Sequence, residues 1–161
     1  MIQELSLPEY YLESVDVDVS PRIGERVIGV VGTNLELENP SIIQDPTGFQ
    51  CSGTLLLQLY EKGKAPWEVE DSSQTLEFGT VETEFVIYIS GDESTLLNYT
   101  QEWIEMGEYD LANPDFKTHL ESGILQYVID PIGKLLETSY SGIVPRITFP
   151  SGEESKYKKE Y

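Results

Sequence analysis

Residues 75–90, TLEFGTVETEFVIYIS, carry the pattern that most constrains how this chain can fold. Leu76 and Phe78 fall in one phase of a two-residue alternation, and the other phase holds four more apolar residues: Val81, Phe85, Ile87 and Ile89. Alternation with this period is typical of a β-strand that buries one face. The phase changes at Gly79, which predicts a bulge or a tight turn there. We therefore expect a sheet with one buried face.

Three other segments in the first half of the chain also predict strands. Residues 15–19, VDVDV, alternate strictly, and residues 26–38 keep apolar side chains in one phase until an Asn-Pro pair ends the strand. Residues 51–63 carry leucines in both phases, which predicts a central strand of the sheet. Residues 40–50 hold two prolines and a glycine and therefore predict a loop.

The apolar spacing changes after Gly91 to the three-to-four-residue period of an amphipathic helix. Asp92 or Ser94 can cap this helix, because their side-chain oxygens accept hydrogen bonds from free backbone N–H groups in the first turn. Acidic residues near the start also suit the positive end of the helix dipole. The pattern predicts a helix that ends at about Gly107.

A second helix is predicted from Asn113, a natural cap, with Pro114 at the first helical position. A strand over residues 124–129 is the competing interpretation of the end of this segment. Pro131 is expected to interrupt the helix, which resumes over residues 132–140. The predicted apolar face of the second helix consists of Phe116, Leu120, Ile124, Tyr127 and Val128.

These segments predict an α+β fold: a mainly antiparallel sheet or sandwich of four to six strands, with a helical region near 94–140 packed against it. Residues 142–149 predict a return strand, which Pro145 places at a sheet edge or a bulge. We expect a single α+β domain over residues 1–150 and a polar C-terminal tail over residues 151–161.

The charge of the chain limits its partners. Ten basic and 29 acidic residues give a formal net charge of −19, and there is no basic residue between Lys64 and Lys117. A chain this acidic is repelled by nucleic-acid backbones and by anionic membranes, so neither direct nucleic-acid binding nor membrane binding is expected. No apolar run is long enough to span a membrane, and no secretion signal is visible, which favours a cytoplasmic location or incorporation in a virus particle.

The sequence offers little material for catalysis. Cys51 is the only cysteine and opens a predicted strand, so we expect a buried thiol. His119 is the only histidine and is expected to be a solvated or hydrogen-bonded helix residue. The pairs Asp16/Asp18 and Glu82/Glu84 resemble the polar side of half-buried strands more than catalytic carboxylates. We therefore predict that the protein is not an enzyme, with no catalytic residue, no metal ligand and no cofactor.

An acidic stretch with no Lys or Arg covers residues 92–110. It predicts an acidic face at Glu102, Glu105, Glu108 and Asp110. Three interpretations compete: a solvated helix face, a docking face for a basic protein surface, and an imitation of the phosphate backbone of DNA. The last interpretation leads to an alternative function, an acidic inhibitor that blocks a basic nucleic-acid-binding site on a partner protein.

The tail has the opposite charge pattern and holds five candidate partner-binding residues: Lys156, Tyr157, Lys158, Lys159 and Tyr161. It could dock on an acidic face of an adjacent copy and so relieve the self-repulsion of the chain. The favoured hypothesis is a structural or interaction protein, a subunit of a larger protein assembly that binds itself or other subunits. A virus-particle or tail-type component is the closest analogy of type.

Overall fold

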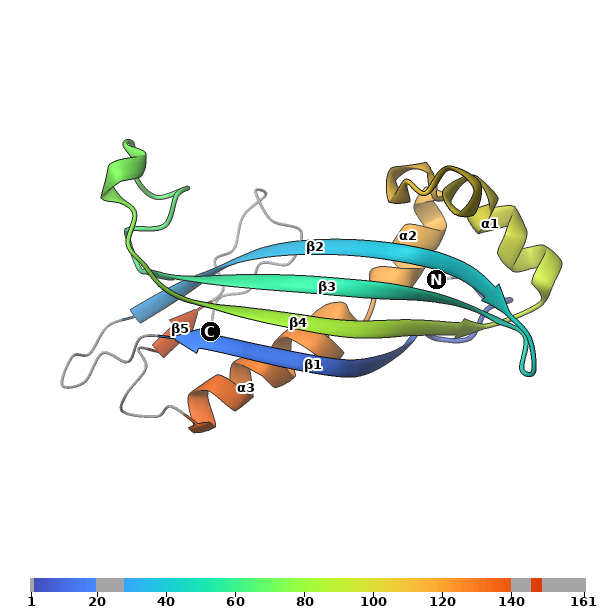
Figure 1. The fold of residues 1–161 in the computed structure, drawn as a ribbon, viewed down its shortest axis with the longest axis horizontal. Coiled ribbons are helices and arrows are strands. Elements are labelled where there is room, and N and C mark those ends of the chain that lie inside the picture. Colours follow the sequence, from blue (N-terminus) through green and yellow to red (C-terminus); the bar gives the residue numbers. More distant parts are fainter. Residues whose placement is uncertain (1, 20–27, 140–145, 149–161) are drawn as a thin grey trace. The chain divides into compact units, whose positions relative to one another are not determined.

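The structure, a computed structural model, describes residues 2–19, 28–139 and 146–148. These residues form a five-stranded sheet in the order β1-β4-β3-β2-β5 (Figure 1). Its strands are β1 (Glu9–Val19), β2 (Ile28–Ile43), β3 (Gly48–Glu61), β4 (Glu77–Ser90) and β5 (Arg146–Thr148). The four long strands run antiparallel to their neighbours, whereas β5 pairs in parallel with residues 28–30 of β2. The predicted α+β class is confirmed.

The helical region follows β4 in the chain. It contains α1 (Glu93–Met106), α2 (Pro114–Glu121), the π-helical turn η3 (Leu125–Ile129) and α3 (Asp130–Ser139). Two short 3-10 turns complete the elements, η1 (Ser72–Gln74) and η2 (Tyr109–Leu111). Helices therefore occupy the region that the apolar spacing predicts.

Contacts within the chain divide it into two compact units, which we describe separately. Unit 1 comprises Met1–Ser14, Glu36–Thr54 and Glu84–Val128. Unit 2 comprises Val15–Leu35, Leu55–Thr83 and Ile129–Tyr161. Each of the four long strands contributes residues to both units, because the boundary falls within the strands.

Unit 1 is built on an aromatic core. The ring of Phe49, from β3, lies 5.4 Å from that of Trp103 on α1 and 5.1 Å from that of Phe116 on α2. All three side chains are fully buried. Tilted and edge-to-face ring pairs at such distances stabilise a core beyond the burial of their area. This cluster fixes both helices on the part of the sheet that belongs to unit 1.

The bounds of α1 and the start of α2 agree with the sequence prediction, whereas α2 ends at Glu121, before the predicted helical spacing does. Asp92 is the N-cap residue of α1, although its side chain makes no capping hydrogen bond, and Gly107 ends the helix with a left-handed φ of 75°. Asn113 caps α2, because its Oδ1 accepts hydrogen bonds from the backbone N–H groups of Asp115 at 2.9 Å and Phe116 at 3.4 Å.

The apolar face predicted for the second helix is confirmed in part. Phe116, Leu120, Ile124 and Val128 are fully buried. Tyr127 is not, because 55% of its surface is exposed. Tyr127 lies in the π-helical turn after α2, where the wider winding of the backbone shifts side chains away from the face that a regular helix would give them.

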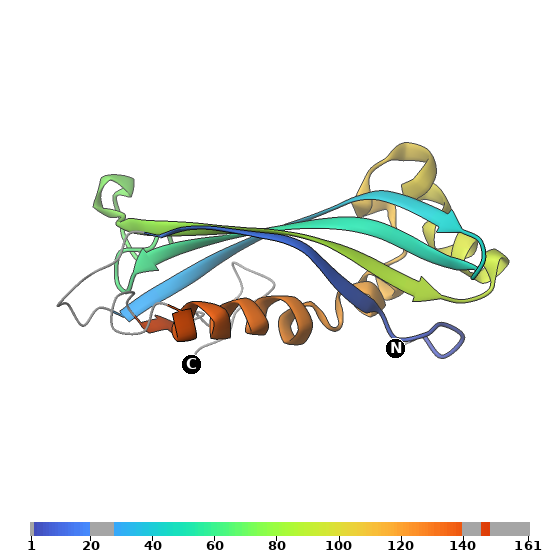
Figure 2. The same ribbon diagram turned by 60° about the horizontal axis from the view of Figure 1, so that its bottom comes forward.

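Unit 2 combines strand segments with α3, which lies along one face of the strands (Figure 2). Ile132 and Leu136 of α3 are buried. The buried strand residues of this unit include Val31, Leu55, Leu57, Leu59, Phe78 and Val81. A smaller cluster joins Tyr60 and Ala65 with Trp67, whose ring meets that of Tyr60 edge to face at 5.8 Å. Unit 2 therefore has a largely aliphatic core.

The expected end of the second long strand at the Asn-Pro pair is wrong. β2 continues through Asn39 and Pro40 to Ile43, and only residues 44–47 form the turn before β3. Asn39 adopts a φ of 55°, a left-handed conformation that asparagine tolerates better than most residues. Beyond residue 30, no described strand pairs with the outer side of β2, and a strand with an unpaired side is where proline is tolerated in a sheet.

The predicted change of phase in β4 is confirmed. Phe78 and Val81 are both buried although they differ in parity, so the strand shifts its phase between them. A Cβ atom at Gly79 would lie 2.8 Å from the backbone oxygen of Asp18. The close approach of β1 to β4 therefore requires a residue without a side chain at this point.

Two expectations about the end of the helical region fail. Residues 124–129 are helical, so the strand alternative is wrong. Pro131 does not end the helical region, which continues without a break from residue 124 to residue 139; it follows directly on the π-helical turn η3, where the regular α-helical winding is altered. The predicted resumption over residues 132–140 corresponds to α3. Of the predicted strand 142–149, residues 146–148 form β5, and the others lie outside the described residues.

Candidate functional site

β1 forms one edge of the sheet, and no described strand pairs with its outer side. The sequence predicts this strand only over residues 15–19, but it begins at Glu9. A free strand edge presents unpaired backbone N–H and C=O groups that can pair with another chain. This edge is the feature of unit 1 best suited to bind a protein.

Tyr10 attaches the first part of β1 to the helices of unit 1. Its hydroxyl donates a hydrogen bond to the carbonyl of Leu120 at 2.6 Å and accepts one from the backbone N–H of Gly123 at 2.9 Å. Burial raises the pKa of Tyr10 to about 12, because the charged phenolate would lose its hydration. Its ring stacks on that of Tyr127 at 6.1 Å. Tyr10 therefore marks the helix-side face of β1.

Large apolar side chains are exposed beside this attachment. Leu12, two residues after Tyr10, is 44% exposed, and Tyr127 is 55% exposed. Tyr11 on the same strand is 54% exposed, and Leu7 just before the strand is 68% exposed. Single exposed apolar residues are normal on a protein surface, but a group along a free strand edge is typical of an interaction site. We call residues 9–14 together with Tyr127 the β1 edge surface.

The opposite face of the same strand segment is acidic. Glu9 accepts a hydrogen bond from the hydroxyl of Tyr11, and this bond is the main reason that the pKa of Tyr11 is raised. Ser14 donates to Oε2 of Glu84 at 3.4 Å. Glu84 alternates with the buried residues of β4, so it lies on the face away from the helices. The β1 edge surface therefore has an aromatic and aliphatic face and a carboxylate face.

The structure places the predicted acidic face at the end of α1. Glu102 and Glu105 lie on α1, Glu108 is the N-cap residue of η2, and Asp110 lies in η2. All four side chains are exposed. We call this set the α1–η2 acidic surface; it belongs entirely to unit 1.

One base already lies against the α1–η2 acidic surface. Lys117 donates a hydrogen bond to the backbone carbonyl of Asp110 at 3.0 Å, and its Nζ lies 4.0 Å from Oδ1 of the same residue. The same Nζ stands 5.1 Å from the ring centroid of Tyr109. Lys117 follows the acidic stretch in sequence, so the run of acids without a base is interrupted in space.

Neither of the two nucleophile or base candidates lies open to solvent. Cys51 is 1% exposed, and burial raises the pKa of its thiol to about 12, so the expected buried thiol is confirmed. His119 is also buried. Its Nδ1 accepts a hydrogen bond from the backbone N–H of Ile2 at 3.3 Å, so Nε2 carries the proton and donates to the carbonyl of Ser6 at 2.8 Å. His119 is thus a hydrogen-bonded helix residue, and the solvated alternative is wrong.

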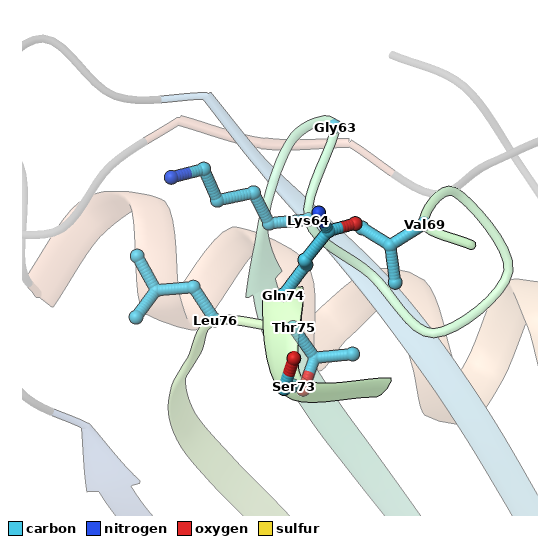
Figure 3. A pocket seen from close by; sticks show the side chains of 7 residues that line it. All are labelled: Gly63, Lys64, Val69, Ser73, Gln74, Thr75 and Leu76. Atoms are coloured by element: carbon cyan, nitrogen blue, oxygen red, sulfur yellow. The ribbon is translucent and has the colours of Figure 1, made fainter. Parts of the chain in front are cut away.

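A shallow cavity of about 490 Å³ lies in unit 2 between the end of β3 and the start of β4. It is lined by Gly63, Lys64, Val69, Ser73, Gln74, Thr75 and Leu76 (Figure 3). The side chain of Lys64 extends away from the hydroxyl groups of Ser73 and Thr75. Thr75 uses its hydroxyl within the turn, donating to the carbonyl of Ser72 at 2.8 Å. These groups do not converge on a common point, as a small-molecule site would require.

Within the described ranges, no three His, Cys, Asp or Glu residues are grouped so that they could hold a metal ion. In the same ranges, no helix is both long and apolar enough to cross a membrane. Five predicted site residues fall outside the described part of the chain: Lys156, Tyr157, Lys158, Lys159 and Tyr161.

Comparisons with known proteins give one weak likeness. No protein-family model matches the chain, and a search of curated proteins finds no match. Among solved structures, the chain is similar to a SecB-like chaperone of Mycobacterium tuberculosis, determined in complex with a ChAD peptide from an antitoxin. The identity is 16%, the TM-score is 0.43, and the alignment covers 94% of this chain and 92% of that chain. A likeness this weak carries no argument about the function of this chain.

The sequence reasoning missed the β1 edge surface. The signal lies at residues 9–14, EYYLES, where three large apolar residues directly precede the alternating valines. Adjacent residues of a strand point to opposite faces of the sheet. If helices cover only one face, some of these adjacent apolar residues must therefore lie on the exposed face. Tyr127 gave no such signal, because its spacing matches the buried face of a regular helix.

Proposed function

We propose that this protein is a non-enzymatic interaction protein, a subunit of a larger protein assembly that binds itself or other subunits through the β1 edge surface. The observation that carries this proposal is the coincidence of a strand edge that no described strand covers with exposed Tyr11, Leu12 and Tyr127. Backbone groups along an edge supply affinity, and neighbouring apolar side chains supply the area that a stable contact has to bury.

Two features support a role without catalysis. Cys51 is inaccessible, and both ring nitrogens of His119 are engaged by the backbone of residues 2 and 6. The paired carboxylates of Glu82 and Glu84 are exposed on β4. A virus particle is one assembly of the proposed kind, and nothing on the described surface favours it over another assembly.

The alternative, an acidic inhibitor of a nucleic-acid-binding protein, would act through the α1–η2 acidic surface. Its case is weaker, because Lys117 already offsets part of the charge at Asp110. The two functions respond differently to salt: charge-based binding weakens steeply with ionic strength, whereas a contact with apolar area survives.

Site-specific photo-crosslinking separates the two proposals. A photo-reactive residue at position 11 samples the β1 edge surface, and the same residue at position 102 samples the α1–η2 acidic surface. We expect protein adducts from position 11 that persist at high salt, and few from position 102. Adducts from position 102 alone, lost at high salt, would favour the inhibitor. No adducts from position 11 at any salt concentration would refute the assembly proposal.

A further inference from the structure

We propose that the basic segment 156–161 of one copy, KYKKEY, adds as a short strand to residues 9–14 of β1 in a second copy. This inference rests on the proposed function, since it names the partner of the same surface. It is carried by the match between the two faces of β1 and the alternation of the basic segment.

The two faces of β1 at residues 9–14 would present different side chains to an added strand. On the helix side, an added strand would lie next to Leu12 and Tyr127, which are apolar and exposed. On the other side, it would lie next to Glu9, Tyr11 and Glu13, which alternate with Tyr10 and Leu12 along the strand. The matching strand therefore carries aromatic or aliphatic residues on one face and basic residues on the other.

Segment 156–161 has this pattern. In an extended chain, Tyr157 and Tyr161 point to one side, and Lys156, Lys158 and Glu160 point to the other, which leaves that second side with one net positive charge. The tyrosines would meet the apolar face of the β1 edge surface, and the lysines would meet its carboxylates. Lys159 shares the side of the tyrosines, where its long aliphatic stem can cover apolar surface while its ammonium group stays in water. The length of the segment equals that of the β1 stretch, six residues in each.

Charge favours this occupant over a second β1 strand. β1 holds Glu9, Glu13, Asp16 and Asp18 and has no basic residue, so two β1 strands would bring like charges together. With a net charge of −19, every contact between copies has to overcome repulsion. Segment 156–161 is where three of the ten basic residues lie, so it is the part of the chain best able to relieve that repulsion.

The segment of a second copy is a better occupant than that of the same copy. β5 ends at Thr148 and pairs with β2, at the opposite edge of the sheet from β1. Three strands, β4, β3 and β2, stand between β5 and β1 in the sheet order. A neighbouring copy can present its β1 edge to the segment without that separation.

A charge swap between two variants tests the inference. The first variant carries Lys156→Glu, Lys158→Glu and Lys159→Glu, and the second carries Glu9→Lys, Glu13→Lys and Glu84→Lys. We expect each variant alone to self-associate with a dissociation constant raised by about tenfold or more, because opposite charges have become like charges. An equimolar mixture should regain association, since each segment then meets a β1 edge of opposite charge. Sedimentation equilibrium measures all three samples.

A matched control carries the same change of charge on the α1–η2 acidic surface, with Glu102→Lys, Glu105→Lys and Glu108→Lys. Its segment 156–161 and its β1 edge are unchanged, so it should self-associate like the wild-type protein. Loss of self-association in this control, or no recovery when the segment variant is mixed with the β1 variant, would overturn the inference. So would a wild-type protein that stays monomeric, or one whose association is unchanged after deletion of residues 152–161.

Failure of this inference and failure of the proposed function give different results. Crosslinks from position 11 to a protein region other than segment 156–161 would keep the assembly role and overturn this inference. A second copy of β1 as the crosslinked region would identify edge-to-edge pairing instead. The absence of crosslinks from position 11 would remove both proposals.

Discussion

β3 and β1 are strands of the same sheet, but they meet different surroundings. Alternate residues of β3 are buried along its whole length, and Leu55, Leu57 and Leu59 have no exposed surface. β1 has no buried residue, although Val15, Val17 and Val19 alternate as strictly as any part of β3. The two-residue period of apolar residues therefore predicts a strand. The elements that pack against that strand determine whether its side chains are buried in the core or exposed at the surface. We expect β3 to determine stability and β1 to determine association.

The largest expected effect on stability comes from β3. Phe49→Ala removes the ring that packs against Trp103 and Phe116, and should lower the free energy of unfolding by about 3–5 kcal/mol, through lost burial and the cavity that remains. Phe49→Leu is the matched control and should cost less, because it keeps most of the volume. Urea denaturation followed by tryptophan fluorescence measures both. A loss below about 1 kcal/mol for Phe49→Ala would mean that this core is not packed as described.

A smaller effect on stability follows from the thiol of Cys51 in β3. Its pKa is about 12 in the folded chain against an ordinary value of 9.0, because burial disfavours the thiolate. A raised pKa means that the folded state holds its proton longer than the unfolded state, so the contribution is fully present below pH 9 and is lost as the pH rises toward 12. At pH 10.5 the loss should be about 2 kcal/mol.

Cys51→Ala isolates this contribution. The fall in the free energy of unfolding between pH 7.5 and pH 10.5 should be smaller in the variant by about 2 kcal/mol, as measured by urea denaturation at both pH values. Tyr11 on β1 offers the contrast: its pKa is raised by the bond to Glu9, but it is exposed to solvent. Removing Tyr11 should leave the alkaline fall unchanged. An equal fall in the wild type and in Cys51→Ala would contradict the assignment.

The smallest effect on stability is expected at the edge strand. Leu12→Ser should change the free energy of unfolding by less than about 1 kcal/mol, because nearly half of this side chain is already exposed. The same change should weaken association clearly, as measured by light scattering across a concentration series. If Leu12→Ser unfolds the chain instead, β1 serves the core and the comparison between the two strands fails.

The sequence predicts the fold class correctly, because the strongest secondary-structure signals in this chain are local. The alternation of residues 77–90 and the Asn113 cap each depend on a few neighbouring residues. The predictions that failed concern positions where tertiary contacts, and not the local sequence, determine the secondary structure. Pro40 lies inside β2 at a point where no described strand pairs with the outer side, and no local signal reports which side of a strand is paired.

The candidate site was predicted less well. The four acids of the α1–η2 acidic surface are exposed as expected, but the sequence did not indicate that Lys117 would lie against Asp110. The β1 edge surface depends on the position of β1 at the end of the sheet order, which pattern alone cannot supply. Tyr127 shows the limit most clearly, since a helical period predicts burial and a π-helical turn exposes the side chain.

Hydrogen exchange at β1 tests most directly whether this edge is covered by another chain. The amides of residues 9–14 that face outward should exchange slowly in concentrated wild-type protein and become fast after deletion of residues 152–161. The amides of β3 should stay protected in both samples, because their partners lie within the sheet. Fast exchange at residues 9–14 in both proteins would contradict a role for this edge in self-association, and slow exchange in both would show that something other than segment 156–161 covers it.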